Sequence, residues 1–240
     1  MPSKSNFESY PFLTNDEFYE ACHQLERRYC QATLGPVRRR WRLRVCTALD
    51  TNFDFDGGYN TYIQITRPLE EVPDDGDLSA CLGGLSVADA KKTDGLLDIM
   101  DRDMIDAEDD EEALHPHPQP DFGHVIYEIL LHPTYRAPCL WFSLHNLPAT
   151  ERAFNIDTVF RRLVPDHFKD GLRTAGGIGG ISAAHHPITG VPCFFVHPCL
   201  LGEAMSNFDC SRENYLMVWL GLVGGCVGLW IPKEMAMDDS

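Results

Sequence analysis

The sequence predicts an α+β fold: one helix, a four-stranded antiparallel meander, then further helices, with a long acidic insertion within the sheet. Three patterns lead to this prediction. They are a capped helical segment near the start, four strand-like segments of which the first two alternate polar and apolar residues, and apolar helical segments in the last third. We expect residues 1–240 to form a single domain, which is consistent with the length of the chain.

The first element is a helix from Thr14 to about Thr33. Thr14 and Glu17 have the spacing of a capping box, in which the threonine side chain and the glutamate side chain each bond the other residue's backbone N–H. The apolar residues that follow repeat at helical spacing and predict the buried face of this helix. They are Phe18, Ala21, Cys22 and Leu25.

Four strands are predicted next. Residues Arg38–Cys46 and Tyr59–Ile65 alternate with period two, and Gly57 and Gly58 indicate a turn between them. Phe122–Leu131 and Cys139–Leu144 supply the third and fourth strands of the meander. A short amphipathic helix is expected over residues 155–163.

The acidic insertion separates the second strand from the third. Residues 70–112 hold 16 acidic and three basic residues, so they carry −13 of the total net charge of −16. A segment so acidic and so poor in aromatic residues buries too little apolar surface to order itself. We therefore predict that residues 68–121 are largely disordered, with a short helix near residues 94–104. They are either a docking segment for an activating enzyme or a solvated spacer.

The nine cysteines predict a reduced, cytosolic protein. They form no C-x-x-C pair, and no apolar signal segment is present at the N-terminus. The longest apolar stretch, Leu216–Pro232, contains four glycines and is shorter than the roughly 20 residues that a spanning helix needs. We expect it to form a core helix followed by a short strand.

Two features indicate ligands only weakly. A basic cluster lies within residues 27–44, and we interpret it as a solvated strand face or a protein-docking patch in preference to a nucleic-acid site, because the chain as a whole is acidic. This basic cluster consists of Arg27, Arg28, Arg38, Arg39, Arg40, Arg42 and Arg44. The glycine-rich run 176–180 lacks the Lys-Ser/Thr of a P-loop and is interpreted as a flexible connection.

The strongest candidate for chemistry is Cys199. The apolar run Pro192–Val196 favours a strand, and Pro198 cannot continue a sheet ladder, so the chain should deliver the thiol of Cys199 onto a loop. The alternatives are a buried, inert cysteine and a zinc site. Zinc is disfavoured because its conceivable ligands lack paired C-x-x-C spacing. Those ligands are His185, His186, Cys193, His197, Cys199 and Cys210.

Three stretches of the chain resemble one family, the E2-like conjugating enzymes of autophagy (the autophagy-related protein 3/10 family). They are Tyr127–Phe142 (YEILLHPTYRAPCLWF), His186–Cys199 (HPITGVPCFFVHPC) and Trp219–Pro232 (WLGLVGGCVGLWIP). The resemblance covers residues 122–232, about half the chain. It implies an E2-like version of the α+β fold and places the reactive cysteine of the family at Cys199.

The resemblance also implies a reaction, because a thiolate is a good nucleophile and its thioester is easily cleaved by an amine. Cys199 would take the ubiquitin-like autophagy-related protein 12 from the E1-like autophagy-related protein 7. It would then pass this modifier to a lysine of autophagy-related protein 5. No metal or other cofactor is expected for this step, and neither is a nucleic-acid partner. The expected location is the cytoplasm, with transient residence at the pre-autophagosomal membrane.

Two further residues are nominated by the resemblance. Tyr135 matches a tyrosine after the third strand, whose phenol would bond the thioester carbonyl or the incoming amine. His197 would orient a reacting group or accept a proton. The alternatives are a tyrosine that only packs and a histidine that only caps a turn. The chain lacks the His-Pro-Asn of ordinary ubiquitin E2 enzymes, and Leu200–Leu201 departs from the more polar residues usual after the cysteine.

Two other functions remain as alternatives. One is the sister activity of the family, conjugation to phosphatidylethanolamine, which would call for a membrane-binding amphipathic N-terminus that residues 1–13 do not show. The other is a non-catalytic scaffold with an E2-like fold, in which Cys199 is inert.

Overall fold

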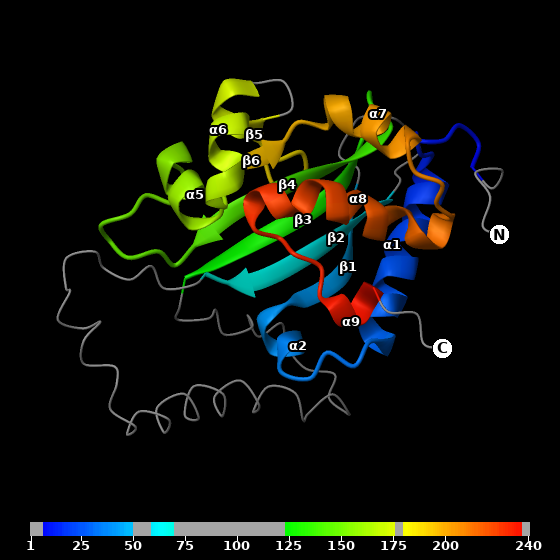
Figure 1. The fold of residues 1–240 in the computed structure, drawn as a ribbon, viewed down its shortest axis with the longest axis horizontal. Helices are drawn as coiled ribbons and strands as arrows, with labels where there is room; N and C mark the ends of the chain where they lie inside the picture. Colours follow the sequence, from blue (N-terminus) through cyan, green and yellow to red (C-terminus); the bar gives the residue numbers. More distant parts are fainter. Residues whose placement is uncertain (1–6, 50–58, 70–122, 176–179, 237–240) are drawn as a thin grey trace. The chain divides into compact units, whose positions relative to one another are not determined.

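The computed structural model describes residues 7–49, 59–69, 123–175 and 180–236, and these form an antiparallel sheet with helices packed on it (Figure 1). Six strands lie in the order β1-β2-β3-β4-β6-β5. Mixed helices and antiparallel strands agree with the predicted α+β class. The predicted four-stranded sheet was two strands short.

The first helix, α1, spans Asn15–Gln31, and its predicted capping box is confirmed. The Thr14 Oγ1 atom accepts from the backbone N–H of Glu17 at 3.2 Å, and the Glu17 carboxylate accepts from the backbone N–H of Thr14 at 2.8 Å. Phe18, Ala21 and the other predicted apolar residues of this helix are buried. They face the sheet, since α1 contacts β1 and β2.

The four predicted strands are present with shifted ends. They are β1 (Arg42–Leu49), β2 (Tyr59–Pro68), β3 (His124–His132) and β4 (Ala137–His145), each antiparallel to the next. The prediction of a strand from Arg38 was wrong, because Val37–Arg40 form the short helix α2. Pro36 has φ −62°, which favours a helical turn, and the guanidinium of Arg38 donates to backbone carbonyls at the end of α1.

The start of the predicted insertion needs a correction of two residues. Pro68 pairs with His124 in the sheet, and the backbone N–H of Leu69 donates to the carbonyl of Gly123 at 2.8 Å. Both residues therefore belong to the folded unit. Residues 70–121 lie outside the described part of the chain, and so do the short helix expected near residues 94–104, the Gly57–Gly58 turn and most of the glycine-rich run 176–180.

Two strands that the four-stranded prediction left out complete the sheet. They are β5 (Ile181–His185) and β6 (Pro192–Val196), which pair with each other, while β6 also pairs with β4 through Leu140↔Val196. The apolar run of β6 was expected as a strand but without a partner. The small residues of β5 gave no alternating pattern, so its pairing could not be foreseen.

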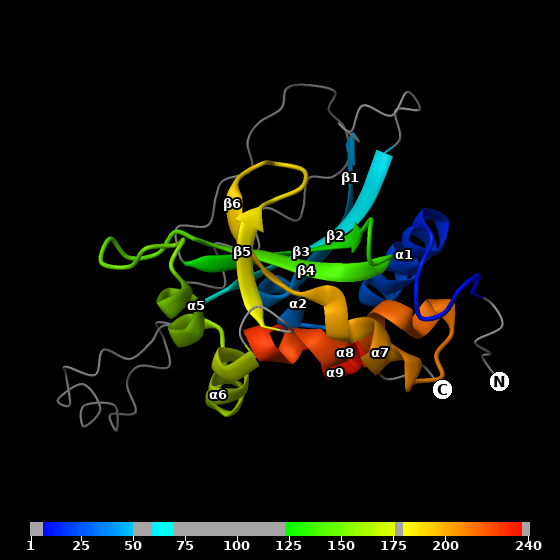
Figure 2. The ribbon, with the colours of Figure 1, turned by 90° about the horizontal axis from the view of Figure 1, so that it is seen from above.

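Helices cover one side of the sheet. Figure 2 shows α7 (Leu201–Ser206), α8 (Tyr215–Val223) and α9 (Lys233–Ala236) gathered on that side. The helices α5 (Ile156–Arg162) and α6 (Asp166–Ala175) follow β4, and Asn155 caps α5 through a bond to the backbone N–H of Asp157. In the described ranges no helix is both long and apolar enough to cross a membrane.

The apolar stretch from Leu216 was predicted as a helix and then a strand, and only the helix is present. After α8 the chain makes a 3-10 turn, Gly224–Val227, and residues 229–232 pair with no strand in the described part of the chain. Gly228 explains this path. Its φ of 70° favours glycine, a Cβ atom there would lie 2.8 Å from the carbonyl oxygen of Leu163, and its own carbonyl accepts from Arg67.

Candidate functional site

Cys199 lies at the end of β6, where the sheet ladder stops. Beyond Val196 the chain enters a 3-10 turn, Pro198–Leu200, which leads directly into α7. His197 caps this turn, because its Nδ1 atom accepts from the backbone N–H of Cys199 at 3.2 Å. The thiol was expected on a loop, and it lies instead on a short helical turn with a fixed start.

Cys199 lines an open pocket of about 370 Å³. Cys199 is partly exposed, and the walls come from three separate regions of the chain: the N-terminal segment, residues 135–137 at the β3–β4 turn, and the 3-10 turn together with α7. The described lining residues are Pro11, Phe12, Tyr135, Ala137, Pro198, Cys199, Gly202, Glu203 and Ser206. Most of this lining is apolar, so a bound chain segment would exclude water from the thiol.

Tyr135 lies on the β3–β4 turn, and its ring is close to the rings of two histidines. Its ring centroid is 4.7 Å from that of His132 and 5.6 Å from that of His197. The Nδ1 atom of His132 accepts from the backbone N–H groups of Thr134 and Tyr135, which fixes the turn. Burial lowers the pKa of His132, and the neighbouring His197 lowers it further. The three predicted site residues, Cys199, Tyr135 and His197, therefore lie together.

The N-terminal segment was not predicted to take part in the site. The backbone N–H of Leu13 donates to the carbonyl of Arg136 at 2.7 Å, and the Arg136 Nε atom donates to the carbonyl of Leu13 at 3.3 Å. The hydroxyl of Tyr10 donates to the carbonyls of Met205 and Phe208 at 2.5 and 2.8 Å. These bonds hold Pro11 and Phe12 against the pocket, and no local sequence pattern reveals contacts between such distant segments.

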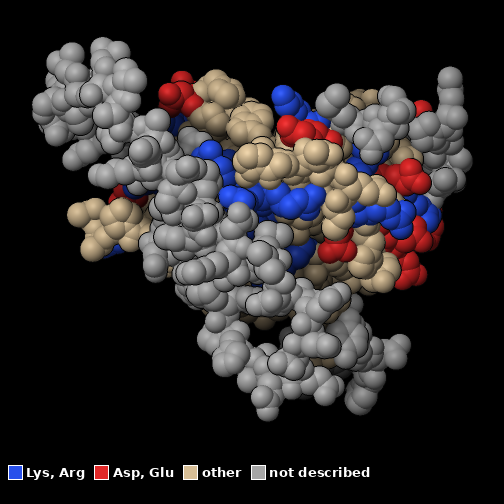
Figure 3. All heavy atoms as spheres, turned by 90° about the horizontal axis from the view of Figure 1, so that it is seen from below, with Lys and Arg blue, Asp and Glu red and all other residues tan. Residues whose placement is uncertain are grey.

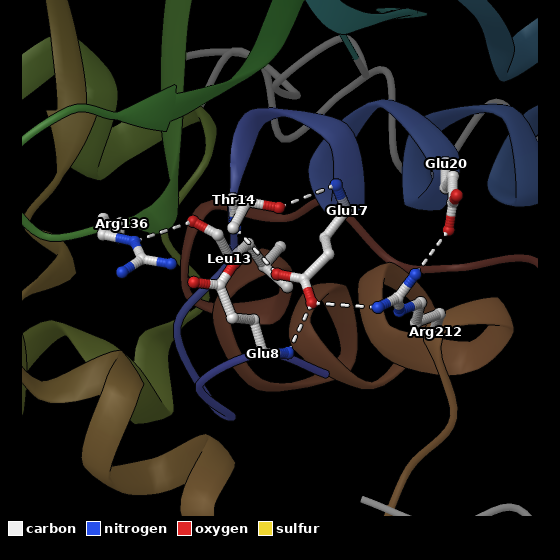
Figure 4. A network of polar contacts seen from close by, with 7 residues as sticks. All are labelled: Glu8, Leu13, Thr14, Glu17, Glu20, Arg136 and Arg212. Atoms are coloured by element: carbon white, nitrogen blue, oxygen red, sulfur yellow. Dashed lines mark hydrogen bonds and ion pairs between the residues drawn. The ribbon is translucent and has the colours of Figure 1, made fainter. Parts of the chain in front are cut away.

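A buried glutamate anchors the same segment (Figure 4). The carboxylate of Glu17 accepts from the backbone N–H of Glu8 at 2.7 Å and from Arg212 at 3.1 Å, in addition to its capping bond with Thr14. Burial alone would raise the pKa of Glu17, but the backbone hydrogen bonds and the charge of Arg212 lower it overall. The carboxylate thus joins α1, the N-terminal segment and the turn before α8.

Several other cysteines are poorly suited to nucleophilic chemistry. Burial raises the pKa of Cys139 to about 12 and that of Cys193 and Cys226 to about 11, which disfavours their thiolates. Cys139 and Cys193 belong to a small apolar cluster with Leu130 and Trp141. In the ranges that the structure describes, no three His, Cys, Asp or Glu side chains converge on a point where a metal ion would fit.

The arginine cluster is partly structural. Figure 3 shows basic side chains gathered on the face that is viewed from below. Arg38 bonds the end of α1, Arg28 donates to Asn214 and to the carbonyl of Met235, and Arg44 donates to Gln64 at 2.9 Å. These three guanidinium groups hold neighbouring elements together, so they have a structural role.

Comparison with known proteins decides the family. The model of the "Autophagocytosis associated protein, active-site domain" family matches residues 17–234. The chain belongs to this family. The match covers most of the chain, so the resemblance seen in three sequence stretches is confirmed and extends to the N-terminal helix and the first two strands.

Members of the autophagocytosis-associated family from distant organisms are similar to this chain. The ubiquitin-like-conjugating enzyme ATG10 of Gibberella zeae is 62% identical over 97% of this chain and 100% of its own length. The human ubiquitin-like-conjugating enzyme ATG10 is 30% identical over 48% of this chain and 53% of its own. The protein of the same name from Arabidopsis thaliana is 29% identical over 47% of this chain and 50% of its own.

Proposed function

We propose that Cys199 carries autophagy-related protein 12 as a thioester and transfers it to a lysine of autophagy-related protein 5. The family and the 62% identical relative support the reaction class, that of an E2-like conjugating enzyme of autophagy. The observation that carries the residue assignment is the position of the thiol. Cys199 lines an open pocket at the end of His-Pro-Cys, beside Tyr135.

The chemistry is an exchange of acyl bonds. The Cys199 thiolate attacks the thioester carbonyl on autophagy-related protein 7, whose own thiolate leaves. The lysine amine then attacks the new thioester, the C–N bond forms, and the C–S bond breaks as the Cys199 thiolate leaves. The proton lost by the amine restores the thiol or passes to water. The residues of this chain need only hold the carbonyl and the amine in place.

His197 is best suited to donate a hydrogen bond in this step. Its Nδ1 atom already accepts from the backbone N–H of Cys199. In a neutral imidazole the other ring nitrogen, Nε2, then carries the proton and acts as a donor. Nε2–H would stabilise the oxyanion. We assign the phenol of Tyr135 a similar role, because its ring packs near His197 and lines the pocket.

The test is to measure intact mass after incubation with activating enzyme, modifier and ATP, with and without reductant. Wild-type protein should gain one modifier through a bond that reductant cleaves. Cys199→Ser should give either no adduct or an oxyester that resists reductant, because the serine hydroxyl is a weaker nucleophile and a poorer leaving group.

Two buried cysteines provide matched controls. Cys193→Ser and Cys210→Ser should charge like the wild type, because neither thiol lines the pocket. A loss of charging in either folded control, with Cys199 intact, would contradict the assignment. Transfer to phosphatidylethanolamine in place of autophagy-related protein 5 would instead point to the sister activity.

A further inference from the structure

Several residues that line the pocket lie on one side of the same helical segment. The 3-10 turn continues into α7 without a break, so residues three, four and seven positions after Cys199 share its side of the helix. These positions are Gly202, Glu203 and Ser206, and all of them line the pocket together with Cys199. Helical neighbours four residues apart have Cβ atoms about 5–6 Å from each other, which places the Glu203 side chain within reach of a group that reacts at the thiol.

Glu203 differs from the other lining residues in its charge. Among the described residues of the pocket it is the only one with a charged side chain, and its carboxylate makes no hydrogen bond or ion pair within the described ranges. The Ser206 hydroxyl is already used, because it donates to the backbone carbonyl of Glu203 at 2.7 Å. The pocket therefore holds one unpaired carboxylate beside the candidate nucleophile.

The remaining walls suit an aliphatic chain. Pro11, Phe12, Ala137 and Pro198 present apolar surface. Gly202 allows the Phe12 ring to approach the helix closely, since a Cβ atom there would lie 3.2 Å from that ring. Apolar walls beside the exposed carboxylate of Glu203 suit lysine, whose methylene stem packs on apolar surface while its ammonium group pairs with a charge or with water.

We propose that Glu203 binds the ammonium group of the acceptor lysine in the Cys199 pocket and holds its nitrogen beside the thioester. This inference rests on the proposed function and adds a residue to it. The ammonium group loses its first proton to water, and the neutral amine forms the C–N bond. The C–S bond then breaks, and the second amine proton goes to the Cys199 thiolate or to water.

The experiment compares two nucleophiles on a pre-charged enzyme. Free lysine carries a charged ammonium group at neutral pH, whereas hydroxylamine is uncharged there. Glu203→Gln keeps the shape of the side chain but removes its charge and its basicity. Single-turnover discharge to lysine should fall on the order of 10-fold or more, because positioning of a reacting group usually contributes at least that much. Discharge to hydroxylamine should stay within about twofold of wild type.

Glu213→Gln is the control for net charge, because Glu213 is exposed and does not line the pocket. It should discharge to both nucleophiles like the wild type. Equal loss toward lysine and hydroxylamine in Glu203→Gln would overturn the proposal in favour of a structural role, which thermal melts would also reveal. Discharge of Glu203→Gln to lysine at the wild-type rate would overturn it as well. Failure of the wild type to charge at all would instead overturn the proposed function.

Discussion

At the scale of single residues, one hydrogen bond restricts the chemistry of His197. Its Nδ1 atom holds the backbone N–H of Cys199 and starts the 3-10 turn that carries the thiol. Capping and oxyanion stabilisation use different ring nitrogens, so one histidine can do both. The two roles can be separated, because aspartate also caps helical turns but, when ionised, has no hydrogen-bond donor.

We predict that Tyr135→Phe and His197→Ala accept the modifier but transfer it slowly. Each removes a donor that acts in the transition state of discharge, and the loss of one such donor costs on the order of 10-fold or more. His197→Asp should recover the thermal midpoint lost in His197→Ala, while its discharge remains slow. Single-turnover discharge to autophagy-related protein 5 measures the rates. Wild-type rates in Tyr135→Phe and His197→Asp would leave positioning by the partner as the source of catalysis.

At the scale of elements, the Glu17 carboxylate connects the start of α1 to the N-terminal segment that lines the pocket (Figure 4). Arg212 pairs with it and also with Glu20, so the chain contains a buried and an exposed carboxylate on the same guanidinium. The side chain of Glu17 is 4% exposed and that of Glu20 is 53% exposed. The two glutamates therefore differ in burial and in backbone hydrogen bonds, because Glu17 also accepts from the N–H groups of Glu8 and Thr14.

We predict that Glu17→Gln lowers the free energy of unfolding by roughly 2–3 kcal/mol at pH 7, because buried N–H donors and Arg212 lose their charged acceptor. Glu20→Gln should cost less than about 1 kcal/mol, as exposed pairs do. The folded pKa of Glu17 is lowered, so its contribution is present above its ordinary value of 4.5 and is lost as the pH falls through the folded pKa. Denaturant titrations should therefore show the Glu17→Gln deficit shrinking below about pH 4.

Local signals in the sequence explain which elements were predictable. The capping box of α1 and the alternation in β2 are short-range patterns, and both gave the right element. The alternation over Arg38–Cys46 predicted the wrong element for Arg38–Arg40, which belong to α2. Pro36 and the contacts of Arg38 favour a helical turn there. Cys199, Tyr135 and His197 were found through the family resemblance. Pro11 and Phe12 were missed because their contacts join the two ends of the chain.

At the scale of the whole molecule, the two strands that flank the acidic segment in the sequence are paired with each other. Leu69 and Gly123 share a backbone hydrogen bond of 2.8 Å, so the ends of β2 and β3 are already side by side. A short turn is enough to join two antiparallel strands in this arrangement. The single-domain prediction therefore has a direct test.

We predict that replacing residues 70–118 with a short Gly/Ser linker leaves the thermal midpoint nearly unchanged. Loop length alters the closure entropy only logarithmically, and the linker needs only to span adjacent strand ends. Calorimetry on the linker variant and on the full chain measures the two thermal midpoints. A large drop in midpoint, or a loss of cooperativity, would mean that the acidic segment packs on the folded unit.

The contacts between Tyr10 and α7 also set an order of events during synthesis. Tyr10 and Met205 are 195 residues apart in the chain, and Tyr215 donates to the carbonyl of Pro11 across 204 residues. A ribosome releases the N-terminal segment long before α7 exists, so the contacts between this wall of the pocket and α7 form only after residues 201–206 have been made. A chain that stops before α7 therefore lacks this part of the pocket, even though it can already hold the N-terminal segment against Arg136 and Glu17.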